Sequence, residues 1–116
     1  MPEGTSARVV LTTAGSVDEA KRISHALVEE RLAACVSLIP AVESIYRWQG
    51  AIETASEVLL ILKTTVDLIP ALGARLHELH SYQTPEFLVL SVEQGSEPYL
   101  AWLTGSVKGG EPAPGV

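Results

Sequence analysis

The alternation of apolar and polar residues divides the chain into short strand-like and helical stretches. Residues 8–13 form an apolar run rich in β-branched side chains, which predicts a first strand. Ser16 and Glu19 then have the spacing of a capping box at a helix start. Behind this box, apolar residues recur at helical spacing, at Ala20, Ile23 and Leu27. We therefore expect a first helix that ends near Arg31.

The middle of the chain has the pattern of a long hairpin. Residues 35–48 are rich in β-forming side chains and predict a long strand. Pro40 lies inside it and predicts a bulge or an edge position, because proline cannot donate to a strand ladder. Gln49 and Gly50 supply a tight reversal. Residues 57–65 predict the next strand, whose continuous apolar centre indicates cover on both faces.

The last part of the chain predicts a helix, a strand and a short final helix. Asp67 is placed to cap a second helix that tolerates Pro70 in its first turn. That helix carries one apolar stripe, made of Leu68, Leu72, Leu76 and Leu79. Residues 87–92 predict a further strand, and residues 99–103 a short helix that Gly105 would end.

The resulting order, β-α-β-β-α-β with a terminal helix, predicts an α+β ferredoxin-like fold. In this split βαβ arrangement, an antiparallel sheet carries its helices on one face. We expect a single domain over residues 7–107 and a disordered tail over residues 108–116, which are rich in glycine and proline. The second face of the sheet would expose apolar side chains, and a large exposed apolar patch predicts self-association.

Composition narrows the classes of partner. The 116 residues carry a net charge of −6, which argues against a nucleic-acid partner. A single cysteine forms no intrachain disulfide, and no apolar run approaches the roughly 20 residues that span a membrane. The N-terminal residues lack the pattern of a signal peptide. These features predict a cytoplasmic protein without a membrane partner.

Enzyme signatures are missing from the sequence. We find no nucleophile elbow, no phosphate-binding glycine loop and no C-x-x-C pair. The run from His77 to His80 is one residue short of the zinc-protease motif. Those two histidines have i, i+3 spacing, which suits either a shared ion or two surface residues that complement a helix dipole. We expect a protein that is not an enzyme.

Five segments together resemble the CutA family of divalent-cation tolerance proteins. They are ERLAAC, SIYRWQG, SEVLLILKTT, HSYQTPE and EPYLAWL, in that order along the chain. The resemblance implies a compact homotrimer whose interface is built by long hairpin strands, and a role in tolerance of, or response to, divalent cations such as copper. It also agrees with the ferredoxin-like fold. Trp48, beside the predicted turn, is then expected to pack against a neighbouring subunit.

The candidate metal ligands are Cys35 and His80, because copper favours soft thiolate and imidazole. Further ligands proposed for bacterial members of the family correspond to Thr12 and Leu79, which replace a cysteine and a histidine here. We expect copper or another divalent cation to be weakly bound. The alternative for Cys35 is a small buried hydrophobe at a helix–strand junction.

A second candidate site contains Lys63, Tyr82 and Glu86, which the resemblance places around a cleft between subunits. An ammonium, a phenol and a carboxylate suit a small anion or polar ligand. They equally suit a structural network of ion pairs between subunits. The alternative function is therefore a trimeric module that binds a small molecule or a protein partner, without a metal role.

Overall fold

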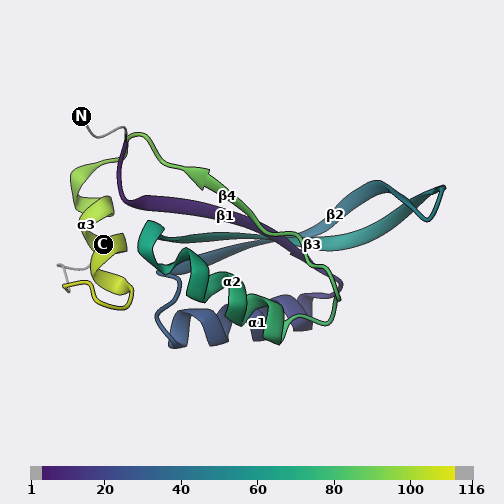
Figure 1. Cartoon of the computed structure of the whole chain (residues 1–116), viewed down its shortest axis with the longest axis horizontal. Coiled ribbons are helices and arrows are strands. Elements are labelled where there is room, and N and C mark those ends of the chain that lie inside the picture. The colour runs from purple at the N-terminus through teal and green to yellow at the C-terminus, as the bar shows by residue number, and fades with distance from the viewer. Residues whose placement is uncertain (1–3, 112–116) are drawn as a thin grey trace.

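The computed structural model describes residues 4–111 and has the predicted order of elements (Figure 1). The elements are β1 (Ala7–Ala14), α1 (Val17–Glu29), β2 (Cys35–Trp48), β3 (Ala51–Thr65), the 3-10 turn η1 (Val66–Leu68), α2 (Ile69–Leu79), β4 (Leu88–Ser91) and α3 (Glu97–Ser106). No helix within residues 4–111 is long and apolar enough to cross a membrane.

The four strands form one antiparallel sheet in the order β2-β3-β1-β4. Helices α1 and α2 lie together on one face of it, and α3 lies at one end (Figure 1). The main core is between these layers, with Val10 and Leu60 of the sheet fully buried among Ile23, Leu27 and Leu72 of the helices. This arrangement confirms the ferredoxin-like α+β prediction.

Helix α1 begins and ends through local hydrogen bonds. The Ser16 hydroxyl accepts from the Glu19 amide at 3.1 Å, as the capping pattern predicts. At the other end, the Leu32 amide donates to the Leu27 carbonyl at 2.9 Å and Arg31 takes a φ of 62°. This left-handed residue ends the helix and turns the chain into β2.

The hairpin of β2 and β3 is longer than predicted, because β3 begins at Ala51. Pro40 fits its prediction: β2 is an edge strand, and its register shifts between Ile39 and Val42, where Ala41 has a φ of 62°. Beyond this bulge the hairpin extends away from the helices as a projecting arm (Figure 1).

Two helix-end predictions were wrong. Asp67 lies in η1 and accepts a hydrogen bond from the Thr65 hydroxyl at 2.7 Å, while Leu68 occupies the cap position of α2. Gly105 lies inside α3, which continues to Ser106. The side chain of Arg31 donates to the Gly105 carbonyl at 3.3 Å, so a distant arginine satisfies the end of this helix.

The predicted tail is only partly described. The Lys108 amide donates to the Arg31 carbonyl at 2.9 Å, so the first residue of this segment is bonded to the domain. Residues 112–116 lie outside the described residues.

The face of the sheet opposite α1 and α2 is only partly covered. On β3, Val58, Leu60 and Leu62 are buried against the helices, whereas Leu59 and Ile61 on the opposite face are half-buried. We expected both faces of this strand to be covered. Within a single chain, only the face toward the helices is fully covered. We call the uncovered side, to which Leu59 and Ile61 belong, the open face.

Candidate functional site

Cys35 is the first residue of β2 and lies on the open face. It is directly opposite Lys63 of β3, and residues paired in this way point to the same side of a sheet. Its thiol is 3.8 Å from the hydroxyl of Tyr99 on α3. Burial, and then the neighbouring thiol, raises the pKa of the Tyr99 phenol. The residue is half-buried, so Cys35 is a more accessible group than a core hydrophobe.

His80 has a different environment at the end of α2. The residue leaves the helix in an extended conformation, and its side chain is fully buried. Its Nε2 lies 2.6 Å from the carbonyl oxygen of Thr13, which can only accept, so Nε2 carries the proton. Its Nδ1 accepts from the Tyr82 amide at 3.0 Å. Both ring nitrogens are therefore engaged, and neither has a lone pair free for a metal.

The carboxylate of Glu19 completes this arrangement. Its Oε2 accepts from the Ser81 amide at 2.8 Å and lies 3.7 Å from Nδ1 of His80. Burial alone would raise the pKa of Glu19, but the hydrogen bonds from Ser81 outweigh it and lower the pKa. The Glu19 side chain thus links the start of α1 to the segment that follows α2. Its position in the capping box had indicated only a role at the start of α1.

Cys35 and His80 are not brought together within one chain. Cys35 is aligned through Lys63 with Val9 of β1, whereas His80 bonds to Thr13 of the same strand. The four-residue offset corresponds to about 13 Å along a strand. The thiol lies on the open face and the imidazole on the helix side. Among residues 4–111, no three His, Cys, Asp or Glu side chains gather as a metal site would require.

The two positions that match further family ligands belong to the core. Thr12 is fully buried, and its hydroxyl has no hydrogen-bond partner. Leu79 packs against the main core cluster. A tight mononuclear metal site therefore does not fit the residues of a single chain.

The second predicted cluster is also dispersed. The Lys63 ammonium donates to the Ser37 hydroxyl at 2.8 Å, beside Cys35. The Tyr82 hydroxyl donates to Glu57, in the middle of β3, at 2.8 Å. The offset of six positions between Glu57 and Lys63 corresponds to about 20 Å along the strand. Glu86 is exposed, without an ion pair among the described residues.

Tyr82 has the most strongly perturbed phenol. Burial, followed by the hydrogen bond and charge of Glu57, raises the pKa of Tyr82 to about 12. Sequence reasoning missed Glu57 as this partner, because nothing local links residues 25 positions apart. It also missed Tyr99 beside Cys35, although Tyr99 lies in one of the five segments that carried the family resemblance.

The projecting arm and the open face carry many exposed apolar side chains. The most exposed are Ile45 at 69%, Ile52 at 62%, Trp48 at 59% and Leu88 at 55%. Such a surface is typical of an interaction site rather than of an isolated monomer. Fold and surface together define a small α+β protein with a ferredoxin-like sheet, one open face and a long apolar hairpin.

Comparison with known proteins identifies the family. The family model described as CutA1 divalent ion tolerance protein matches residues 8–106. The divalent-cation tolerance protein CutA of Thermus thermophilus is 48% identical over 95 residues, which cover 82% of this chain and 92% of that protein. Human protein CutA is 52% identical over 84 residues, 72% of this chain but only 47% of the human protein. This chain belongs to the CutA1 family.

Solved structures of the family have the same fold. CutA from Xylella fastidiosa superposes with a TM-score of 0.88 at 38% identity, covering 90% of this chain and all of that chain. CutA1 from Oryza sativa also gives 0.88, at 35% identity, covering 93% of this chain and 99% of its own.

Proposed function

We propose that this chain acts in divalent-cation tolerance as a homotrimer that binds copper weakly through Cys35. The observation that carries the proposal is the match to the CutA1 divalent ion tolerance family across residues 8–106, almost all of the described domain. The apolar open face and the projecting arm support self-association, because burying them removes apolar surface from water.

Cys35 is the favoured copper contact for two reasons. It provides the soft thiolate that copper prefers, and its thiol is only half-buried at the start of an edge strand. His80 is the weaker candidate, because a metal would have to displace the Thr13 carbonyl or the Tyr82 amide from its ring. Each chain then offers a single soft ligand, Cys35, and we therefore expect copper binding to be weak. In a trimer, the other two copies would supply further thiols.

Copper titration against a competing chelator tests this assignment. Cys35→Ser should weaken copper binding by at least about tenfold, because it removes the thiolate. Ser37→Ala, on the same face of β2, is the matched control and should leave copper affinity unchanged. Magnesium and calcium should bind poorly to either protein, since they prefer oxygen ligands. An unchanged copper affinity in Cys35→Ser would contradict the proposal.

A further inference from the structure

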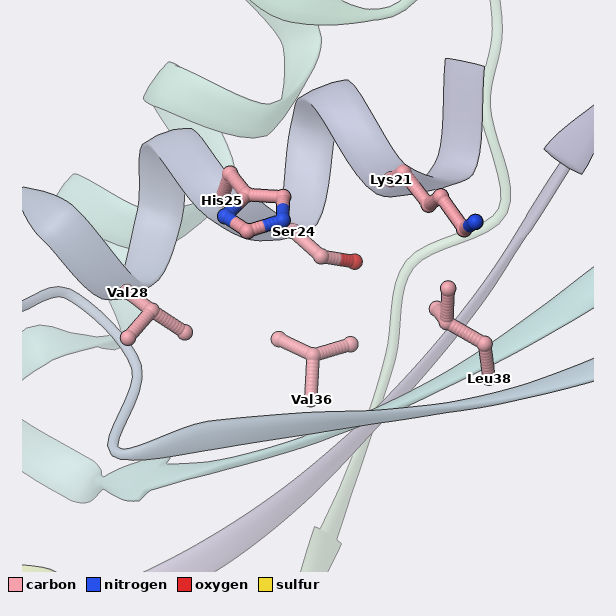
Figure 2. A pocket seen from close by; sticks show the side chains of 6 residues that line it. All are labelled: Lys21, Ser24, His25, Val28, Val36 and Leu38. Atoms are coloured by element: carbon pink, nitrogen blue, oxygen red, sulfur yellow. The ribbon is translucent and has the colours of Figure 1, made fainter. Parts of the chain in front are cut away.

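A groove separates α1 from the edge strand β2, on the face of the sheet opposite to that of Cys35 (Figure 2). It has a volume of about 410 Å³ and is lined by Lys21, Ser24, His25, Val28, Val36 and Leu38. The four helical residues follow i, i+3, i+4, i+7 spacing and share one face of α1. Val36 and Leu38 alternate along β2 and point toward that face (Figure 2). The volume is within the range of small-molecule sites.

Ser24 contributes an unusual polar group to this groove. The residue is only 9% exposed, and its hydroxyl oxygen is buried without a hydrogen-bond partner. Helical serine and threonine normally bond to a carbonyl one turn earlier, as Thr104 and Ser106 of α3 do at 2.9 and 2.7 Å. In Figure 2 the Ser24 hydroxyl points into the space between α1 and β2. An unpaired buried hydroxyl is costly, and a ligand atom would satisfy it.

The charges at the rim favour an anion. Lys21 is exposed and has no carboxylate within 4.0 Å among the residues of the described domain. His25 provides a second nitrogen-bearing side chain one helical turn further on. On α1, Asp18 precedes Lys21 by three positions and Glu29 directly follows Val28, and neither forms an ion pair with Lys21. The Lys21 ammonium at the rim therefore has no carboxylate bound to it among the described residues.

Three of the six residues that line the groove are aliphatic, namely Val28, Val36 and Leu38. We propose that this groove binds a small amphipathic carboxylate. The Lys21 ammonium and the Ser24 hydroxyl receive the carboxylate group, and the three aliphatic side chains receive a short hydrocarbon body. One ammonium and one hydroxyl match a single negative charge better than a phosphate, which proteins usually cradle with several donors. The volume admits roughly ten non-hydrogen atoms.

Amide NMR of the full chain, titrated with hexanoate and with 1-hexanol, tests this site. Hexanoate should shift the amides of residues 21–28 and 36–38, with a dissociation constant on the order of 1 mM. Lys21→Gln and Ser24→Ala should each weaken hexanoate binding by about tenfold and leave hexanol binding unchanged, because each removes a contact to the charged group. Val28→Trp should block both ligands by filling the groove from its rim.

Lys108→Gln is the matched control, since Lys108 is an exposed lysine on the turn after α3. It should bind hexanoate as the parent chain does. The amides of the projecting arm report whether each variant keeps its fold. The proposal is overturned if hexanoate leaves the groove amides unshifted, as it would if a second copy covered them. Equal binding of hexanol and hexanoate, insensitive to Lys21→Gln, would also overturn it. Neither result depends on copper binding at Cys35.

Discussion

At the scale of single residues, His77 and His80 have opposite environments although they are three positions apart. His77 is exposed on α2, as expected for a residue near a helix C-terminus. The sequence suggested that His80 is either a metal ligand or a surface residue. Its side chain is instead buried and forms hydrogen bonds with the Thr13 carbonyl and the Tyr82 amide. The difference arises because α2 ends at Leu79, and the extended His80 turns back toward β1.

His80→Ala should therefore destabilise the protein strongly. It leaves the buried Thr13 carbonyl and the partly buried Tyr82 amide without partners. Each unsatisfied group costs about 1–3 kcal/mol, for a combined loss of about 2–6 kcal/mol in the free energy of unfolding. His77→Ala should change that free energy by less than about 0.5 kcal/mol. Denaturant unfolding of both variants at one protein concentration is the measurement. Equal effects would show that the imidazole of His80 is not a structural link.

Tyr82 gives a pH prediction at the same scale. Its folded pKa of about 12 is above the ordinary value of 10.0, mainly through burial and then through Glu57. The folded state therefore holds this proton more tightly than the unfolded state. The resulting stabilisation is complete below pH 10 and is lost as the pH rises from about 10 to about 12.

Phenolate absorbance measured against pH tests this value, with Tyr82→Phe to identify the late-titrating phenol. Glu57→Gln should lower the pKa of Tyr82, because it removes the carboxylate that the neutral phenol bonds. Glu53→Gln, an exposed substitution on the same strand, should leave it unchanged. A Tyr82 that titrates with the ordinary phenol value would contradict the burial argument.

At the scale of elements, the projecting arm has apolar side chains that nothing within the described residues of a single chain covers. Trp48 and Tyr46 alternate on one side of β2, and Ile45 and Arg47 on the other, so both sides carry exposed aromatic or aliphatic groups. A two-stranded ribbon with little core of its own is marginally stable in water. We therefore expect the arm to pack on another copy of the chain.

Trp48→Ala should lower the melting temperature and loosen the assembly. If the indole is buried between subunits, its truncation costs roughly 3–5 kcal/mol per copy. Arg47→Ala, which changes the adjacent residue on the opposite side of β2, is the control and should have a small effect. Sedimentation and thermal unfolding measure both. A Trp48→Ala protein with the parent mass and melting temperature would show that the indole does not anchor the interface.

At the scale of the whole molecule, the open face predicts self-association, and the resemblance to the CutA family implies that the assembly is a trimer. Sedimentation at micromolar concentration should give three times the chain mass of 12.4 kDa. The melting temperature should rise with protein concentration, because assembly stabilises the folded chain. A folded monomer at that concentration would refute the prediction.

Lys63→Ala separates two roles of the open face in that assembly. The Lys63 ammonium bonds Ser37 within the chain, and β3 places it beside Cys35. A trimer that survives Lys63→Ala supports a ligand cleft, whereas a trimer that dissociates supports a structural network between subunits. The same sedimentation experiment decides between them.

The sequence by itself determined the features that have local causes. Ser16 caps α1, Pro40 accompanies a bulge on an edge strand, and Gln49 and Gly50 form a turn in which both have positive φ values. Each depends on backbone chemistry within a few residues. The periodicity of apolar residues likewise predicted the order of strands and helices, because burial on one face repeats with the period of the element.

Only the tertiary structure decided what the candidate site residues contact. His80 bonds Thr13 across 67 positions, Glu19 bonds Ser81 across 62, and Arg31 reaches Gly105 across 74. The separation of Cys35 from His80 likewise follows from sheet register and from the face on which each side chain lies. Such contacts depend on how distant segments align in three dimensions. Residue type and spacing can nominate a ligand, but the packing of the folded chain determines whether its lone pairs are free.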